Sequence, residues 1–254
     1  MNIAVTGATG TMGRTVIETA NDRPDVTVAF GIDQAADEGP IDGVRIYAPS
    51  EFGALLEESR PNVIVDFSAP AATLSFVEAA ADAGVAVVIG TTGFDEAGLS
   101  TLRDASETVP VLKASNFARG VWALLRAVED AVGAVPGYDI EVTETHHNRK
   151  VDAPSGTANT ILERIDSVRG EAEKVYGREG NQPREGDEIG VFARRAGNIR
   201  GEHEVLLAGN DEVLTLTHRA ESRRVFAEGA LDAAVWLAGS HPGWYGFDDV
   251  LGDA

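Results

Sequence analysis

The stretch that decides the fold of this chain is Asn2-Ile3-Ala4-Val5-Thr6-Gly7-Ala8-Thr9-Gly10-Thr11-Met12-Gly13-Arg14. Its first five residues form an apolar run typical of a strand, and residues 15–20 continue at helical period after the glycines. The glycine spacing is G-x-x-G-x-x-G, which a tight turn with close helix packing would explain equally well. The stretch therefore predicts a strand, a turn and a helix, and leaves nucleotide binding to be decided by its context.

One acidic residue gives the glycine turn a more specific meaning. Asp33 follows the next expected strand, residues 26–32, and lies about 20 residues beyond Gly13, where a carboxylate binds the ribose of a dinucleotide. We therefore predict that the glycine turn and Asp33 bind a dinucleotide. Asp33 would repel a 2′-phosphate and favours NADH over NADPH, and the neighbouring Gln34 adds no cation, although Arg14 lies near enough to contact a phosphate.

Strands and helices alternate through the first half of the chain. Further apolar strands are expected at residues 63–67, 85–89 and 109–112, with helical stretches such as residues 73–83 between several of them. This alternation predicts a Rossmann-like parallel sheet with helices on both faces.

Three loops follow expected strands at the carboxyl edge of this sheet, where open α/β sheets bind their ligands. Gly90-Thr91-Thr92-Gly93 and Ala114-Ser115-Asn116-Phe117 are expected to line the nicotinamide and substrate side of the crevice. Asp66-Phe67-Ser68 is interpreted instead as a helix cap before Pro70.

The pattern changes after Asn116. Helices are expected at residues 121–128 and 157–165, a loop at residues 177–186, and strands at residues 138–144, 189–193, 204–207 and 213–217. Successive strands favour a smaller α+β domain with an open mixed sheet. We predict a first domain over residues 1–117, completed by residues 223–254 with a final helix at residues 226–237, and a second domain over residues 118–222.

The run from Glu144 to Ala158 holds the densest group of reactive side chains. His146 and His147 can give and take protons beside the positive charge of Lys150, and Ser155-Gly156-Thr157 opens an expected helix whose free N–H groups favour an anion. The run therefore predicts a site for a reactive, negatively charged small molecule. Zinc is not expected, because adjacent histidines on a strand point to opposite faces and no cysteine completes a ligand set.

Charge and composition exclude several classes of function. The net charge of −20, with only three lysines, argues against nucleic acids and anionic membranes as partners. The excess of acids over nearly every helix favours adaptation to high salt. The absence of cysteine excludes thiolate chemistry, and the lack of any apolar run of about 18 residues, with no charged leader, predicts a cytoplasmic protein.

The run from Glu144 to Ala158 closely resembles the signature of the dihydrodipicolinate reductases of lysine biosynthesis. The likeness covers nearly the whole chain and includes Gly7 to Arg14, Gly90 to Phe94, Ser115 to Phe117, Gly201 to His203 and Arg223 to Trp236. It implies NAD(P)H-dependent reduction of 4-hydroxy-tetrahydrodipicolinate to tetrahydrodipicolinate with loss of water. It also implies a homotetramer formed through the sheet of the second domain, which would bind the dicarboxylate substrate.

The resemblance also assigns roles to individual residues. His146 matches the acid/base histidine and Lys150 the proton-donating lysine, while His147, Gly156 and Thr157 match positions that hold substrate. The positions that match cofactor contacts are Gly7, Ala8, Thr9, Gly10, Thr11, Met12, Asp33, Gly90, Thr91, Thr92, Ala114, Ser115, Asn116 and Phe117.

This chain departs from the common family pattern at Thr11, where the family often has arginine, and at Asn198 and Arg200 in Gly197-Asn198-Ile199-Arg200-Gly201. Neither change touches His146 or Lys150. Two other functions remain open on the residues alone. A dehydrogenase acting on aspartate or its semialdehyde would not need the run from His146 to Lys150, and an inactive NAD-sensing protein would not need Lys150 or Gly156-Thr157.

Overall fold

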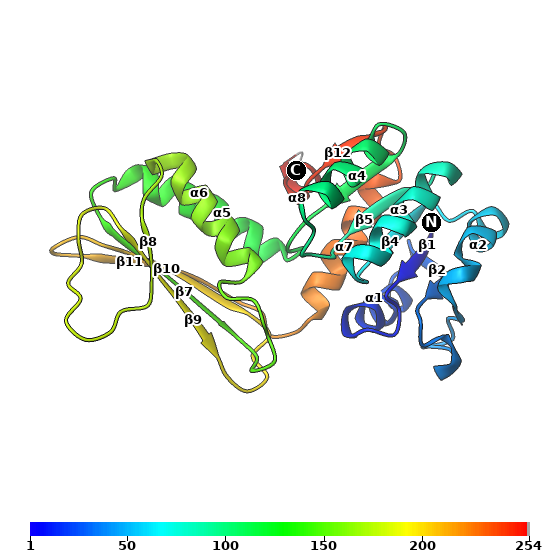
Figure 1. Ribbon diagram of the computed structural model, residues 1–254, viewed down its shortest axis with the longest axis horizontal. Coiled ribbons are helices and arrows are strands. Elements are labelled where there is room, and N and C mark those ends of the chain that lie inside the picture. Colours follow the sequence, from blue (N-terminus) through cyan, green and yellow to red (C-terminus); the bar gives the residue numbers. More distant parts are fainter. Residues whose placement is uncertain (253–254) are drawn as a thin grey trace. The chain divides into compact units, whose positions relative to one another are not determined.

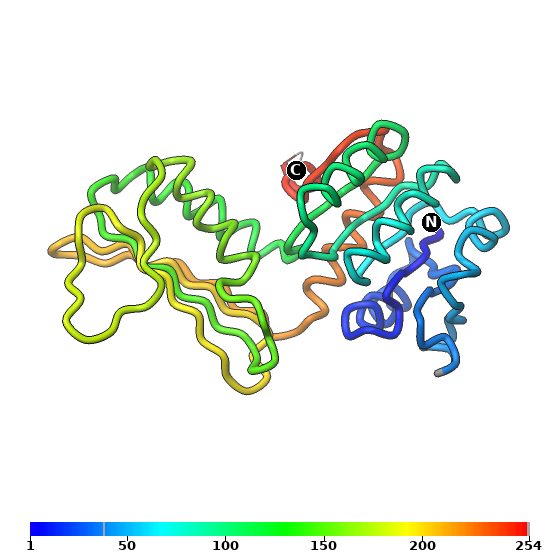
Figure 2. The backbone as a smooth tube through the Cα atoms, viewed as in Figure 1, coloured from blue at the N-terminus to red at the C-terminus, as the bar shows by residue number. Residues whose placement is uncertain are grey.

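The computed structural model describes residues 1–252, so the last two residues of the predicted C-terminal segment, 253–254, lie outside the described part of the chain. The chain divides into two compact units. Unit 1 contains Met1–Ala118 and the segment from Arg223 onward, and unit 2 contains Arg119–Ser222. The chain therefore returns to unit 1 after unit 2. In Figure 2 the red C-terminal segment belongs to the same unit as the blue N-terminus.

Unit 1 is built on a seven-stranded, entirely parallel sheet with the strand order β12-β6-β5-β4-β1-β2-β3. Figure 1 labels five of these strands, β12, β5, β4, β1 and β2. Its strands are β1 (Asn2–Thr6), β2 (Thr27–Ile32), β3 (Ile46–Tyr47), β4 (Val63–Asp66), β5 (Ala86–Ile89), β6 (Pro110–Lys113) and β12 (Gly243–Tyr245). Its helices are α1 (Thr11–Asn21), α2 (Phe52–Ser59), α3 (Pro70–Ala83), α4 (Glu96–Ser106), α7 (Arg224–Leu237) and α8 (Phe247–Gly252), with short 3-10 turns at Ala36–Glu38 and Pro49–Glu51. The predicted Rossmann-like sheet is confirmed.

Both faces of this sheet are buried, which explains its nearly continuous apolar strands. Ile3 and Val5 of β1 belong to a core shared with α1 and α7, whereas Ala4 belongs to a second core shared with α2, α3 and α4. Successive residues of a strand point to opposite faces, so the alternation along β1 fills both cores. The glycine turn that follows β1 is thereby fixed at the carboxyl edge of the sheet.

Unit 2 contains a five-stranded mixed sheet with the order β11-β10-β7-β9-β8, as predicted. In it β10 runs antiparallel to β7 and β11, and β9 runs parallel to β7 and β8. Helices α5 and α6 contact each other, and they contact β11 and β7 respectively (Figure 1). The bounds of these elements are α5 (Arg119–Ala134), β7 (Asp139–His146), α6 (Gly156–Arg169), β8 (Lys174–Tyr176), β9 (Ile189–Arg195), β10 (Glu202–Ala208) and β11 (Val213–Arg219).

Some element assignments differ from the sequence predictions. The helix expected at residues 73–83 begins at Pro70, because proline fits the first helical position, and its N-cap is Ala69. The interpretation of Asp66-Phe67-Ser68 as a helix cap is therefore wrong. The helix expected to be final, residues 226–237, is followed by β12 and α8. The strands β3, β8 and β12 went unpredicted because two or three residues are too few to show a period.

Candidate active site

Two glycines of the turn in unit 1, Gly7 and Gly13, are packed too closely for any other residue. Gly7 has a φ of +70°, and a Cβ there would lie 2.3 Å from the carbonyl oxygen of Phe67, while a Cβ on Gly13 would lie 2.1 Å from the carbonyl oxygen of Gly7. Helix α1 starts within this stretch at Thr11, so Gly13 belongs to its first turn, and its N-cap Gly10 offers no side-chain acceptor. The first N–H groups of α1 can therefore serve an anion such as a pyrophosphate.

A cavity of about 360 Å³ lies beside this turn. Asp33 is fixed at its wall, because one carboxylate oxygen accepts a hydrogen bond from the backbone N–H of Thr9 at 3.1 Å and the other from Ala35 at 3.3 Å. Of the predicted cofactor residues, Gly7, Thr9, Gly10 and Asp33 line the cavity. Ala8 is fully buried beneath the turn, Met12 packs against the core, and Thr11 is exposed.

Sequence reasoning missed part of the lining. Phe67, Ser68 and Ala69 follow β4 and border the same cavity, as do Ala72 and Phe76 of α3. The pairing of β4 with β1 puts the two strand ends side by side. Open α/β sheets bind ligands at the carboxyl ends of their strands, and this rule predicted the other two loops. Applied to the end of β4, the same rule would have predicted Phe67 and Ser68.

Asp66 joins several of these strand ends. Its side chain is fully buried and accepts hydrogen bonds from four hydroxyl groups: Thr6 at 2.6 Å, Ser68 at 2.5 Å, Thr73 at 2.7 Å and Thr91 at 2.6 Å. These donors come from β1, from the segment after β4, from α3 and from the loop after β5. One carboxylate thus fixes the position of Thr91 relative to the cavity wall.

The remaining predicted residues of unit 1 lie near the ends of β5 and β6. Thr92 and Ser115 are exposed, and Asn116 accepts a hydrogen bond from the backbone N–H of Ala118. Phe117 is only 2% exposed and packs edge-to-face against Phe67 and Phe247, so its ring belongs to the core. Gly90 is held close, because a Cβ there would lie 2.1 Å from the ring of Phe67. Ala114 also packs partly against the core.

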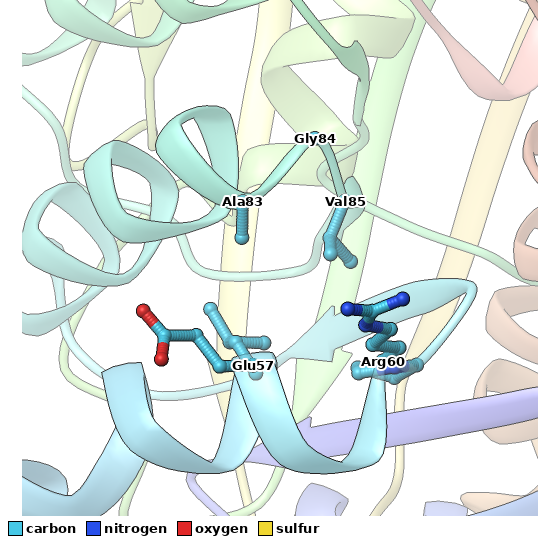
Figure 3. Close-up of a pocket in the computed structure, with 7 residues that line it drawn as sticks. Glu57, Arg60, Ala83, Gly84 and Val85 are labelled. Carbon is cyan, nitrogen blue, oxygen red and sulfur yellow. The ribbon is translucent and has the colours of Figure 1, made fainter.

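A second, larger hollow of unit 1, of about 630 Å³, lies at the opposite edge of the sheet, where β4 and β5 begin. Figure 3 shows the side chains of Glu57 and Arg60 reaching from α2 and its end toward the turn formed by Ala83, Gly84 and Val85. None of the predicted site residues lines it. Ligands of parallel sheets bind at the carboxyl edge, so the smaller cavity is the better candidate.

The reactive residues of unit 2 lie at one end of its sheet, on three neighbouring strands. Glu144 and His146 are two residues apart on β7 and point to the same face. The strand register places Arg195 of β9 beside His146 and His203 of β10 beside Glu144. Residues from distant parts of the sequence are in this way brought to one cluster.

Glu144 is the centre of this cluster. Its carboxylate is 2.6 Å from Nδ1 of His146 and accepts hydrogen bonds from both terminal nitrogens of Arg195 at 2.7 Å and from the backbone N–H of Ser155 at 3.0 Å. Burial by itself would raise the pKa of Glu144, but the hydrogen bonds from His146 and Arg195 lower this pKa to about 2. The carboxylate is therefore ionised.

His203 is buried next to Ser155. Its Nε2 lies 3.1 Å from the Ser155 hydroxyl, and its ring stacks edge-to-face with that of His146 at 5.2 Å. Burial, aided by the nearby charge of His146, lowers the pKa of His203 to about 3, so the ring is neutral at physiological pH.

Helix α6 starts at the predicted anion-binding turn. Ser155 is its N-cap, and the Ser155 hydroxyl accepts a hydrogen bond from the backbone N–H of Ala158 at 3.2 Å. Gly156 and Thr157 form the first helical turn, Gly156 half-buried and Thr157 buried. The predicted helix start is thereby confirmed.

The loop between His146 and Ser155 carries the predicted lysine. Lys150 pairs with Asp152 at 2.7 Å, and its side chain is 21% exposed. The backbone N–H of Lys150 donates to the carbonyl of His147 in a turn, and Arg195 donates to the carbonyl of Asp152 at 2.6 Å. Arg195 thus ties the lysine loop to Glu144. Within residues 1–252 no three acidic or histidine side chains form a metal-binding group.

Unit 1 combines a parallel sheet with a glycine turn and a carboxylate placed to bind a ribose. Unit 2 of the same chain has a histidine held by a carboxylate next to a helix N-terminus. Together these features define a two-domain nicotinamide-dependent oxidoreductase. The comparison with known families makes this class specific. Residues 1–117 match the family model for the N-terminus of dihydrodipicolinate reductase, and residues 120–251 match the model for its C-terminus. The chain belongs to the dihydrodipicolinate reductase family, and the predicted family and enzyme class are confirmed.

Known relatives agree with this assignment. The chain is 57% identical over 249 residues to the 4-hydroxy-tetrahydrodipicolinate reductase of Haloarcula marismortui, covering 98% of both chains. It is also 57% identical to the enzyme of the same name from Natronomonas pharaonis, covering 99% of this chain and all of that one. A solved dihydrodipicolinate reductase from Paenisporosarcina sp. TG-14, with dipicolinate bound, has the same fold, with a TM-score of 0.80, 22% identity and 98% coverage of both chains. Across residues 1–252, none of the helices has the length and hydropathy that crossing a bilayer requires.

Proposed function

We propose that this chain catalyses the NAD(P)H-dependent reduction of 4-hydroxy-tetrahydrodipicolinate to tetrahydrodipicolinate, with loss of water, in lysine biosynthesis. Within the family assignment, one observation carries the proposal: His146, held by Glu144, stands at the end of β7 immediately before Lys150 and the start of α6. A bound reduced nicotinamide supplies the hydride that the conjugated imine of the substrate accepts.

Unit 1 offers the residues that would hold this cofactor. The N–H groups at the start of α1 suit the pyrophosphate, and the carboxylate of Asp33 at the cavity wall suits the ribose hydroxyls. The loops after β5 and β6, which contain Thr91, Thr92 and Asn116, would lie toward the nicotinamide. NADH is the favoured cofactor, because the negative charge of Asp33 opposes a 2′-phosphate.

Unit 2 offers the groups that bind and protonate the substrate. The N–H groups at Gly156 and Thr157, with His147 nearby in sequence, would hold a carboxylate of the dianion. Lys150 adds positive charge and donates a proton to the atom that becomes electron-rich on reduction, and His146 acts as acid and base. Substrate binding and proton transfer are thus both assigned to the second domain.

The assay that tests this function generates the condensation product of pyruvate and aspartate semialdehyde in situ, in high salt, and follows NADH or NADPH oxidation by absorbance. Lys150→Ala should lower turnover by roughly 100-fold or more, the scale of a positioned proton donor, with little change in cofactor affinity. Lys174→Ala is the matched control, since Lys174 pairs with Asp166 in the same unit, away from this cluster, and its loss should leave turnover unchanged. Full turnover by Lys150→Ala would exclude the proposed role.

The assembly proposed for this enzyme is a homotetramer formed through the sheet of unit 2. Helices α5 and α6 pack against one side of that sheet, and the edge strand β11 retains exposed apolar residues such as Val213, which is 60% exposed. Light scattering on the purified protein should give about four times the chain mass of 26.7 kDa. A monomeric mass would contradict the proposal. A cytoplasmic location stays a prediction from the sequence.

A further inference from the structure

The two carboxylate oxygens of Glu144 have different hydrogen-bond partners. One oxygen, Oε1, accepts the backbone N–H of Ser155 at 3.0 Å, and the other, Oε2, lies 2.6 Å from Nδ1 of His146. Each oxygen also accepts one terminal nitrogen of Arg195 at 2.7 Å. The Glu144 side chain has no exposed surface, whereas 11% of the His146 side chain is exposed. Glu144 therefore cannot touch a substrate directly and can act only through its neighbours.

This arrangement fixes which nitrogen of His146 carries a proton. An ionised carboxylate only accepts hydrogen bonds, so the contact of 2.6 Å requires a proton on Nδ1. Nε2 is then the nitrogen left to exchange a proton with a ligand. Gly201 leaves room beside that atom, because a Cβ at Gly201 would lie only 3.2 Å from Nε2.

We propose that Glu144 is the positioning residue of the site: it holds His146 as the Nδ1–H tautomer with Nε2 free to react, and Arg195 keeps the carboxylate in place. This inference rests on the acid/base role proposed for His146. Through Ser155, the N-cap of α6, the same carboxylate also anchors the turn proposed to bind the substrate. Proton transfer and anion binding therefore share one support.

The decisive variant is Glu144→Gln, which keeps the shape of the side chain but can present an amide N–H₂ to His146. Nδ1 would then become an acceptor and Nε2 would carry the proton, which is the wrong form for a base. We expect kcat to fall roughly 100-fold, with the KM for NADH within about two-fold of wild type. The KM for the substrate should rise by a smaller factor, since Ser155 keeps an amide oxygen as its acceptor.

Glu141→Gln is the matched control. Glu141 lies on the same strand and is also bound by two arginines, Arg178 and Arg184, but it does not contact His146. The same chemical change there should leave kcat within about two-fold of wild type. If the loss of a charge on β7 lowered kcat only by disturbing the fold, kcat would fall in both variants.

A spectroscopic readout separates positioning from structural support. Two-dimensional ¹H–¹⁵N spectra of protein labelled at histidine should show Nδ1–H for the neutral His146 ring in wild type and Nε2–H in Glu144→Gln. An Nε2–H tautomer in wild type would overturn the proposal, even if the variant failed to fold. So would wild-type kcat in Glu144→Gln.

The failure of this inference can be told apart from failure of the proposed function. If His146→Gln retains full turnover, the acid/base role itself is wrong. If His146→Gln is inactive while Glu144→Gln is fully active, only the positioning role is lost. Arg195→Lys, which keeps a cation but loses the paired hydrogen bonds, should give a kcat between those of wild type and Glu144→Gln.

Discussion

Asp66 shows how much one buried carboxylate can organise in unit 1. Four hydroxyl groups from β1, α3 and two loops donate hydrogen bonds to its carboxylate, and none of these four donors is a cation. The sequence alone could not reveal this, because Thr6, Thr73 and Thr91 are far apart in the chain and threonine is common at strand and helix ends. The fold supplied the proximity.

Replacing Asp66 with alanine should cost more stability than an ordinary surface change. Four buried or half-buried hydroxyls would lose their acceptor, and we expect the free energy of unfolding to fall by about 3 kcal/mol or more. Denaturant titration measures this loss. Asp95→Ala removes the same charge from the N-cap of α4, which accepts one hydrogen bond from Gly98, and should cost about 1 kcal/mol. Equal losses for the two variants would mean that the cluster around Asp66 adds nothing.

Asp33 decides the choice of cofactor if its carboxylate meets the ribose. Asp33→Ala should raise the KM for NADH more than the KM for NADPH. With NADH the variant loses the acceptor for the ribose hydroxyl, whereas with NADPH it loses the carboxylate that repels the 2′-phosphate. Steady-state kinetics with both cofactors measures the ratio. Asp37→Ala is the control for loss of a nearby charge, since Asp37 is exposed and does not line the cavity. Equal weakening of both cofactors in Asp33→Ala would show that Asp33 does not distinguish them.

At the scale of elements, the strands that sequence patterns predicted best are those buried on both faces. The expected strand at residues 2–6 coincides with β1, and the expected strand at residues 85–89 differs from β5 by one residue. Runs this short could also belong to a buried helix, and it is the flanking glycines and the β-branched residues that favour a strand. Short edge strands such as β3 form only through pairing with β2, which local sequence does not encode.

The cluster around Glu144 was only partly predictable for the same reason. The dense run from His146 to Thr157 indicated a reactive site, but the sequence assigned no role to Glu144 within it. Arg195 and His203 reach it through the register of β7 with β9 and β10, and a register cannot be read from one strand. Pairing across the sheet is what assembled this part of the site.

The junction of β7, β10 and α6 should make unit 2 sensitive to acid. The pKa of His203 is about 3 in the folded chain, below its usual 6.5, so from pH 6.5 downward the unfolded chain binds a proton that the folded chain does not. Stability should therefore fall as pH drops from 6.5 toward 3. Glu144, with a pKa of about 2 instead of 4.5, adds a loss in the same direction between pH 4.5 and 2.

Between pH 6.5 and 4.5 the loss comes from buried histidines, and burial lowers the pKa of His218 on β11 as well as that of His203, so a single variant removes only the share of His203. There His203→Gln should have a flatter dependence of unfolding free energy on pH than wild type, by at most about 1.4 kcal/mol per pH unit. Denaturant unfolding at several pH values measures the slope. His241→Gln, which changes an exposed histidine of unit 1, should keep the wild-type slope. A slope for His203→Gln equal to that of wild type would contradict the assignment.

At the scale of the whole molecule, charge sets the conditions in which the chain is stable. The sequence has 41 acidic residues against 21 lysines and arginines, so acids outnumber possible cationic partners about two to one. Ion pairs such as Arg224 with Asp22 are exposed, with 46% and 62% of the side chains accessible, and contribute little. Repulsion among unpaired carboxylates is therefore the larger effect, and salt relieves it.

The melting temperature should accordingly rise with KCl, most steeply below about 1 M, where the screening length falls from about 10 Å to about 3 Å. Differential scanning calorimetry across this range measures the rise. Replacing Glu57 and Glu58, two exposed acids of α2, by glutamine should raise the melting temperature at low salt and reduce its dependence on KCl. Sucrose, which stabilises proteins without screening charge, should act equally on both proteins. A melting temperature that falls as KCl approaches molar concentration would mean that the exposed ion pairs outweigh the net repulsion, and that the acidic surface has a role other than tolerance of salt.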